Sequence, residues 1–370
     1  MESLITPEKA LVLIANGSSS IDVRAPVEFR RGALPFSTNL PILNDEQRAE
    51  VGLRYKLEGP EGARRLGYQL ISGNLREERI SVWLDHLARE PAALLYCARG
   101  GQRSQIAADW IHDAGYQVQR IEGGFKSMRS QLLPLLAPDS KDIVVLGGST
   151  GVGKTVVVQN DENAIDLEGY ANHRGSAFGA LLAEQPSQID FENAVALQFL
   201  KQRFSASSGA KDSSTLLEDE GRMIGRINLP PSLQIAMQQA PLIILEATFE
   251  SRVSHIFKEY VIDHLAAIRA AGVQDAFDAL EVRLSNSLLA IRKRLGGSRH
   301  QMMHELLASA VEAHKEGDPS GHREWIRSLL IDYYDPMYAY QLEKKQHRVV
   351  FRGSAEEIMG WRARNALATS

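Results

Sequence analysis

Residues 142–155 read DIVVLGGSTGVGKT, an apolar run followed directly by a glycine-rich loop that ends in Lys154 and Thr155. Gly148 and Gly153 stand five positions apart, which together with the Lys-Thr pair is the spacing of a P-loop. The glycines let successive backbone N–H groups turn inward around a phosphate, and the lysine neutralises its charge. We therefore predict a strand, a loop and a helix, with the phosphate contacted by Gly148, Ser149, Thr150, Gly151, Val152, Gly153, Lys154 and Thr155.

The residues after the loop limit what this unit does with a phosphate. VVVQNDENA (156–164) is rich in β-branched Val, so the helix is predicted to last only a couple of turns. Hydrolysis of a nucleoside triphosphate is therefore not assumed. The Thr155 hydroxyl can hold Mg²⁺. Otherwise we expect no tightly bound cofactor and no resident metal.

Further apolar runs at 164–167, 215–219, 242–247 and 348–351 complete a five-stranded parallel sheet that resembles P-loop nucleotide kinases. Acidic residues end several runs, either as partners for Mg²⁺ or as surface residues: Asp166, Glu218, Asp219 and Glu246.

The segment before the last strand is predicted to be helical. From Phe277 to Leu295 apolar residues recur every three or four positions, which predicts a helix with one buried side. We place an all-helical insertion at about 252–345.

The first part of the chain predicts a second α/β unit. Up to about residue 137, short apolar runs alternate with helical segments, the pattern of a doubly wound parallel sheet. A chain of 370 residues also exceeds the usual size of one core. We predict domains at 1–137 and 138–370, joined near 132–142.

Composition favours a globular enzyme, with 44% hydrophobic and 24% charged residues. No run of 18 apolar residues occurs, and MESLITPEKA lacks the pattern of a signal peptide. We expect a cytoplasmic protein with no membrane partner.

The single cysteine, Cys97, lies in LLYCARGGQRSQ (94–105), where a predicted strand gives way to a helix. It is either a small buried hydrophobic residue or a lone nucleophile. Gly100 and Gly101 allow inward N–H groups, while Arg99 and Arg103 add positive charge. Such surroundings bind anions and favour the thiolate.

These residues resemble a known family. IDVRAPVEFRRGALPFSTNLP (21–41), CARGGQRS (97–104) and IEGGFKSM (121–128) are similar to rhodanese domains. That resemblance implies a cysteine that carries sulfur or selenium. Cys-x5-Arg-Ser is also the spacing of cysteine phosphatases, some of which share this fold, although Tyr96 stands where they usually carry His.

The order of the two units resembles the tRNA 2-selenouridine synthases. Supporting stretches include NDEQRAEVGLRYKLEGPEGARRLGYQL, IDLEGYANHRGSAFG, EDEGRMIGRINLP and LLIDYYDPMYAYQLEKK. The resemblance implies a transferase that replaces the sulfur of wobble 2-thiouridine in tRNA by selenium. The family is understood to attach a geranyl group from geranyl diphosphate to that sulfur, then to exchange it using selenophosphate. Lys154 and its loop suit the diphosphate. The Cys97 loop suits selenophosphate or a perselenide.

Two other features are open to interpretation. His173 and Arg174 are either substrate contacts or part of a polar surface turn. From Arg283 to His300 there is no acidic residue, so Arg292, Lys293, Arg294 and Arg299 form either a tRNA contact or a solvated helix face. A net charge of −4 gives no general attraction to RNA.

Two alternatives of other classes remain. One is a rhodanese-fold cysteine phosphatase or sulfurtransferase with a nucleotide-binding P-loop domain. The other is a non-catalytic protein that senses a nucleotide and docks a partner.

Overall fold

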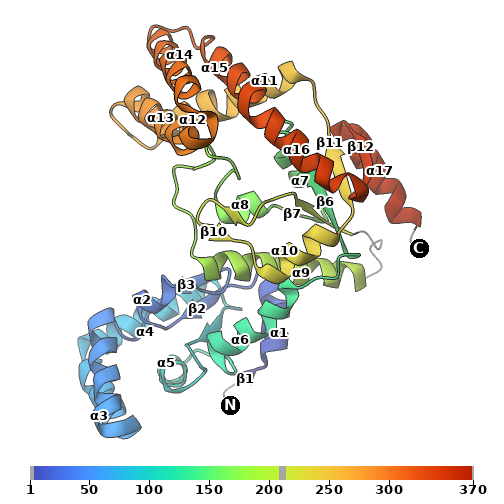
Figure 1. Ribbon diagram of the computed structural model, residues 1–370. Helices are drawn as coiled ribbons and strands as arrows, with labels where there is room; N and C mark the ends of the chain where they lie inside the picture. Colours follow the sequence, from blue (N-terminus) through green and yellow to red (C-terminus); the bar gives the residue numbers. More distant parts are fainter. Residues whose placement is uncertain (1–3, 208–213, 369–370) are drawn as a thin grey trace. The chain divides into compact units, whose positions relative to one another are not determined.

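The computed structural model describes residues 4–207 and 214–368 and divides into two compact units (Figure 1). The first unit contains Met1–Ala137 and Pro186–Ser205, and the second contains Pro138–Gln185 and Ala206–Ser370. The chain therefore passes between the units three times. The sequence placed all of 138–370 in one domain, and the assignment of 186–205 differs because that segment packs on the first unit.

The sheet of the first unit has five parallel strands in the order β1-β5-β4-β2-β3. They are β1 (Leu4–Ile5), β2 (Ser20–Asp22), β3 (Ser37–Asn39), β4 (Leu94–Tyr96) and β5 (Gln119–Ile121).

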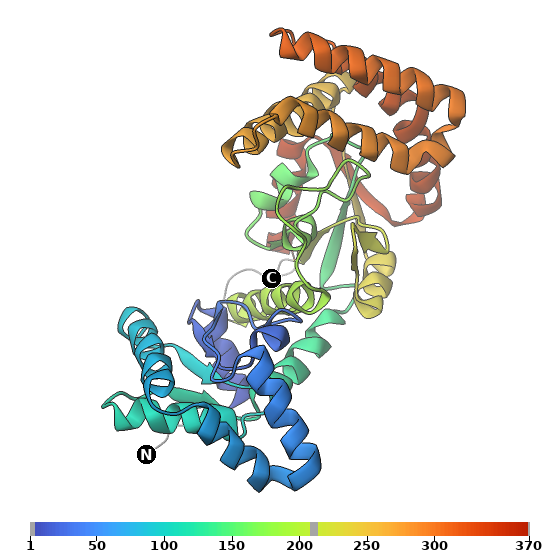
Figure 2. The same cartoon turned by 90° about the vertical axis from the view of Figure 1, so that its left-hand side faces the viewer.

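Helices cover this sheet in the doubly wound arrangement that the sequence predicts. Helix α1 packs against α6, while α4 and α5 pack together over Ile21 and Leu95 of the sheet (Figures 1 and 2). The helices are α1 (Pro7–Ala15), α2 (Pro26–Phe29), α3 (Asp45–Leu70), α4 (Asn74–Arg89), α5 (Gln102–Asp113) and α6 (Gly124–Leu132), followed by a 3₁₀ turn (Leu133–Leu136).

The Asp-Val-Arg motif at the end of β2 has a structural role. Asp22 and Arg24 are both buried, and Arg24 Nη2 lies 2.6 Å from Asp22 Oδ2. The same guanidinium donates to the Gly32 carbonyl at 2.8 Å and lies 4.1 Å from the centre of the Phe125 ring. This pair therefore fixes the chain that enters α2 against the start of α6.

Helix α9 (Gln188–Ser207) joins the first unit although it follows the P-loop in sequence. Its Asn193 side chain donates to the Ala33 carbonyl at 2.7 Å, and Asp190 accepts from the Ala33 N–H at 2.7 Å. Phe191 and Phe199 are buried. Helix α9 thus binds the first unit through hydrogen bonds to Ala33 and buries two aromatic side chains.

The second unit contains the predicted parallel sheet, in the order β12-β11-β6-β8-β7. Its strands are β6 (Ile143–Gly147), β7 (Ala164–Ile165), β8 (Thr215–Glu218), β11 (Leu242–Leu245) and β12 (Val349–Gly353). A hairpin of β9 (Met223–Ile224) and β10 (Ile227–Asn228) was not predicted.

Short helices flank this sheet. Val157 and Val158 of α7 share one core with Ile358 of α17, while α10 packs on β6. These helices are α7 (Lys154–Gln159), α8 (Leu167–Ala171), α10 (Pro231–Gln239) and α17 (Ala355–Ala368).

The insertion is helical from α11 (Phe249–Phe257) to α16 (Asp335–Lys345). Between them lie α12 (His264–Ala270), α13 (Ala276–Leu295), α14 (Gly297–Lys315) and α15 (His322–Leu329), with π-helical segments η2 (Lys258–Asp263) and η3 (Leu330–Tyr334). The predicted apolar face of α13 is buried in the core of the insertion. Among the described residues, no helix is both long and apolar enough to span a bilayer.

Candidate functional site

Cys97 follows β4 and lies at the carboxyl end of the first sheet, where ligands of open α/β sheets usually bind. Its side chain belongs to the core of the unit and only 3% of the residue is exposed. The sulfur lies 3.2 Å from Ser104 Oγ. Cys97 is also among the residues that line a cavity of about 890 Å³, a volume typical of small-molecule sites.

The glycines of the Cys97 loop permit close backbone packing. Gly100 has a φ of 61°, and a Cβ there would lie 2.6 Å from the Gly123 nitrogen. A Cβ on Gly124 would lie 2.2 Å from the Cys97 carbonyl oxygen. That carbonyl accepts from the Phe125 N–H at 2.9 Å. The loop and the first turn of α6 therefore hold each other in one conformation.

The two arginines of the loop differ in their surroundings. Arg99 is exposed, whereas Arg103 donates to Glu28 with Nη1–Oε2 at 2.5 Å and Nη2–Oε1 at 3.1 Å. Burial alone would raise the pKa of Glu28, but the hydrogen bonds from Arg103 outweigh it and the pKa lies below its usual value. The sequence predicted that Arg99 and Arg103 both add positive charge to the Cys97 loop. In the structure the Glu28 carboxylate balances the charge of Arg103.

The P-loop follows β6 as predicted. Gly148, Gly151 and Gly153 all have φ values between 80° and 151°, which side-chain-bearing residues rarely adopt. Lys154 begins α7, and its Nζ lies 3.5 Å from the Gly148 carbonyl oxygen. Helix α7 has only six residues, which confirms the short helix predicted from the valines.

Two arginines from distant parts of the second unit reach this loop. Arg252 of α11 donates from Nε to the Thr150 carbonyl at 2.9 Å and pairs with Asp335 of α16. Arg174 donates to Thr155 Oγ1 at 3.2 Å and pairs with Glu259 at 2.8 Å. Arg174 was predicted from the sequence but Arg252 was not, because the contact partners of Arg252 lie 83 and 102 residues away.

Three glutamates, Glu168, Glu218 and Glu220, form an acidic cluster beside Lys154. Burial, followed by neighbouring carboxylates, raises the pKa of Glu168 and of Glu218 to about 8. Burial also raises the pKa of Glu220 to about 7, and the side chains of Glu168 and Glu220 share a hydrogen bond. Burial alone would lower the pKa of Lys154, but Tyr338 and the three glutamates outweigh it and the pKa is raised. The protonation state of Lys154 and of each of the three glutamates therefore depends on the charges of the others.

The other predicted polar residues have different partners. Asp166 caps α8 by accepting from the Gly169 N–H at 2.6 Å. Asp219 accepts from Lys345 at 2.6 and 2.8 Å, and Glu246 is exposed. Burial and the nearby Arg283 lower the pKa of His173, which lies beside Gly225. Glu218 is thus the one of the four predicted acidic strand ends that is fully buried in the cluster with Lys154.

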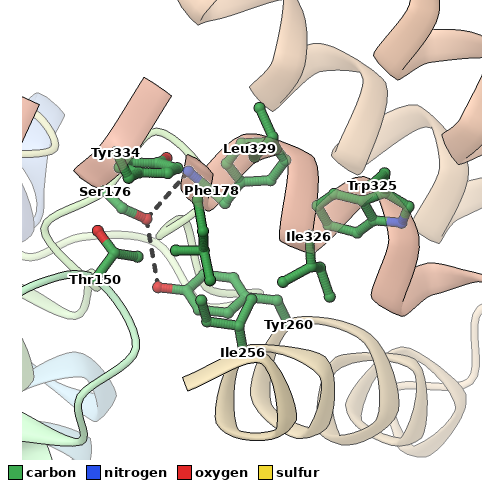
Figure 3. Close-up of a pocket in the computed structure, with 10 residues that line it drawn as sticks. Thr150, Ser176, Phe178, Ile256, Tyr260, Trp325, Ile326, Leu329 and Tyr334 are labelled. Atoms are coloured by element: carbon green, nitrogen blue, oxygen red, sulfur yellow. Dashed lines mark hydrogen bonds between the residues drawn. The ribbon is translucent and has the colours of Figure 1, made fainter. Parts of the chain in front are cut away.

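A small apolar pocket of about 20 Å³ adjoins the P-loop at Thr150 (Figure 3). Tyr260 and Ser176 face each other across it, with their hydroxyl oxygens 3.3 Å apart. The described residues that line it include no charged side chain: Thr150, Ser176, Phe178, Ile256, Tyr260, Trp325, Ile326, Leu329, Leu330 and Tyr334. Both π-helical segments contribute to this lining, a distortion that is frequent at functional sites.

The predicted basic residues lie on the insertion. Arg292, Lys293 and Arg294 are exposed at the end of α13, and Arg299 is exposed in the first turn of α14. Their exposure is compatible with both interpretations offered by the sequence.

Comparison with known proteins agrees with this arrangement. The tRNA 2-selenouridine synthase AAA domain family matches residues 141–369, and the rhodanese-like domain family matches residues 6–131. The tRNA 2-selenouridine synthase of Hahella chejuensis (strain KCTC 2396) is 44% identical over 98% of this chain and 96% of its own. The enzymes of that name from Pseudomonas aeruginosa (strain LESB58) and Shewanella frigidimarina (strain NCIMB 400) are 45% and 43% identical, over 95% and 94% of this chain and 95% of their own. The chain belongs to the tRNA 2-selenouridine synthase family.

Proposed function

We propose that this protein is a tRNA 2-selenouridine synthase that works in two steps, prenylation and selenation, at the P-loop and at the Cys97 loop. The observation that carries the proposal is that a chain of this family has two separate loops suited to oxyanions, one beside a lysine and the other beside its only cysteine. Each donor, geranyl diphosphate or selenophosphate, presents an oxyanion.

In the first step, the P-loop and Lys154 bind the diphosphate of geranyl diphosphate. The sulfur of wobble 2-thiouridine attacks C1 of the geranyl group, forming a C–S bond while the C–O bond breaks. Diphosphate leaves with the electron pair, and the N3 proton of the base passes to water. Fixed N–H groups and Lys154 stabilise the departing charge.

In the second step, the Cys97 loop binds selenophosphate and Cys97 is the nucleophile. Its thiolate adds to C2 of the S-geranyl base, and geranylthiolate leaves with the electrons of the C2–S bond. The selenium of selenophosphate then displaces the Cys97 sulfur from C2. Water cleaves the Se–P bond, giving selenouridine and phosphate. Arg99 and the glycine backbone at Gly100 and Gly101 are suited to the phosphate oxygens.

Mg²⁺ fits as a companion of the diphosphate. Glu218 Oε1 is buried and has no hydrogen-bond partner among the described residues, and Glu218 is close enough to affect the pKa of Lys154. Thr155 and Glu218 would hold the cation. When bound, it would neutralise charge on the leaving diphosphate.

Nucleoside mass spectrometry tests the proposal on 2-thiouridine-containing tRNA incubated with the protein, geranyl diphosphate and selenophosphate. We expect 2-selenouridine to appear, with S-geranyl-2-thiouridine alone when selenophosphate is omitted. Cys97→Ser should retain geranylation and lose selenation, whereas Lys154→Ala should lose geranylation and retain selenation of S-geranylated tRNA. If Cys97→Ser still converts S-geranylated tRNA, Cys97 is not the nucleophile. Unchanged geranylation by Lys154→Ala would remove the diphosphate role.

The phosphatase alternative keeps one supporting observation, the Cys-x5-Arg-Ser spacing. Rapid hydrolysis of p-nitrophenyl phosphate by the wild-type protein would favour it.

A further inference from the structure

The cavity that contains Cys97, here called the Cys97 cavity, has a volume of about 890 Å³. Helix α3 forms one side, and the Cys97 loop with α5 forms another. Its volume lies in the range of about 300–1,000 Å³ that is typical of small-molecule sites. The cavity is therefore large enough for more than a selenophosphate ion.

The lining of this cavity is mixed. Its basic and polar members come from the Cys97 loop, from α5 and from α3, and include Arg99, Gln102, Arg103, Arg48, Lys56 and Arg64. Its apolar members include Ile42, Leu43, Val51, Ile71, Ile106 and Trp110, which pack in one core with Cys97. A complementary ligand has both an anionic or polar group and a hydrocarbon part.

Helix α3 carries exposed apolar side chains at this place. Leu53 and Tyr55 are each 58% exposed, Tyr68 is 47% exposed, and all three line the cavity. Exposed apolar groups that gather at a cavity mark a binding surface more often than scattered ones do. The helix breaks at Gly59, whose φ is 75°, directly before Pro60. Residues on both sides of this break line the same cavity.

We propose that the Cys97 cavity binds the hydrocarbon chain attached to the sulfur of the S-prenylated base, and so holds the C2 atom at the Cys97 thiol. This inference rests on the second step of the proposed function. It adds that the chain is a recognition element in selenation as well as part of a leaving group. The apolar lining excludes water from the chain, while the arginines of the lining receive the base and the selenophosphate.

Two leucines one helical turn apart on α3 provide a matched test. Leu53 lines the cavity, whereas Leu57 is 73% exposed and is not part of the lining. Both are surface residues before the break at Gly59, so neither Leu53→Asp nor Leu57→Asp should disturb folding, which thermal unfolding can verify. The substrates are anticodon stem-loops that carry S-geranyl-2-thiouridine or S-methyl-2-thiouridine at the wobble position.

Equilibrium binding to the full chain without selenophosphate gives the primary readout. We expect the wild type and Leu57→Asp to bind the S-geranyl RNA at least about tenfold more tightly than the S-methyl RNA. Leu53→Asp should lose most of that difference while binding the S-methyl RNA unchanged. Equal affinity of the wild type for both RNAs would overturn the inference. An equal loss of affinity for both RNAs in Leu53→Asp would also overturn it, and would indicate that RNA bases stack on α3.

Selenation kinetics with selenophosphate separate this inference from the proposed function. Leu53→Asp should raise the KM for the S-geranyl RNA by about tenfold and leave its geranylation of 2-thiouridine RNA unchanged. A wild type that binds the S-geranyl chain but never forms selenouridine would contradict the proposed function and leave the cavity assignment supported. A second variant, Ala63→Phe, adds bulk inside the cavity at a buried lining position and should act in the same direction.

Discussion

Arg252 and Asp335 form a two-point ion pair between α11 and α16, with Nη2–Oδ1 at 2.5 Å and Nη1–Oδ2 at 3.1 Å. Because the same guanidinium donates to the Thr150 carbonyl, the helical insertion holds the backbone of the P-loop. The P-loop is thus supported by residues far from it in sequence.

Arg252→Ala should lower the free energy of unfolding by about 2–4 kcal/mol, because it leaves Asp335 and a loop carbonyl without their partner. It should also reduce geranylation. Arg327 pairs with Glu250 at the surface of the same insertion, so Arg327→Ala is a suitable control, with a much smaller expected loss because the pair is exposed to solvent. Urea unfolding measures both, and equal effects of the two variants would contradict the support of the loop by Arg252.

The acidic cluster predicts a dependence of stability on pH. Because burial raises the pKa of Glu218 from 4.5 to about 8, the unfolded chain loses this proton first, and stability falls as the pH rises from about 4.5 through 8. Glu218→Gln keeps an oxygen for the Glu168 N–H and removes the ionisation. Its Tm should equal that of the wild type near pH 4.5 and exceed it by about 3 °C or more at pH 8. Exposed Glu246→Gln serves as the control, and a constant difference across pH would refute the prediction.

Gly124→Ala should damage the Cys97 loop selectively. The new Cβ would lie 2.2 Å from the Cys97 carbonyl oxygen, and the φ of 56° adds strain. We expect a destabilisation of about 2–4 kcal/mol and loss of selenation, with geranylation retained. Gly221→Ala, which meets no atom within 4 Å, should be close to neutral. Selenation at the wild-type rate in Gly124→Ala would show that the loop tolerates movement.

Arg174→Ala tests the bridge between Thr155 and Glu259. Loss of a charged donor beside the P-loop should weaken binding of inorganic diphosphate about tenfold, measured by calorimetry. Arg174→Lys should restore part of this affinity because it keeps the charge. If Arg174→Ala binds diphosphate as the wild type does, Arg174 only orders the loop that contains it.

Replacement of Arg292, Lys293, Arg294 and Arg299 by Ala tests the tRNA contact. If all four neutralise phosphates, the slope of log affinity against log salt should become shallower by roughly 3. The sequence of the bound tRNA should make no difference to this change. An unchanged slope would assign these residues to a solvated face.

The sheets and both loops could be predicted because their signals are local. The glycine spacing before Lys154 and the apolar runs of β6, β8, β11 and β12 lie within short segments. The choice among acidic strand ends could not be made from sequence, since it depends on distant partners. Asp219 pairs with Lys345, 126 residues away, whereas Glu218 turns into the cluster with Lys154.

Glu168 and Glu220 were missed for a related reason. Glu168 stands alone in IDLEGY, and Glu220 is the last residue of the acidic run EDE at 218–220, a pattern that is typical of a solvated surface. Only packing brings their carboxyl groups together beside the P-loop. The position of α9 also could not be predicted from local sequence patterns, because its hydrogen bonds with Ala33 span 157 and 160 residues.

That position of α9 has a practical consequence for dissecting the enzyme. A fragment cut after residue 137 would lack the partners of the Ala33 backbone and the helix that carries Phe191 and Phe199. We expect such a fragment to aggregate and to express poorly. Its lack of activity would therefore carry no information about selenation. A fragment intended to fold as the first unit should therefore include residues 186–205, joined to residue 137 by a flexible linker. These residues belong to the first unit although they follow the P-loop in sequence.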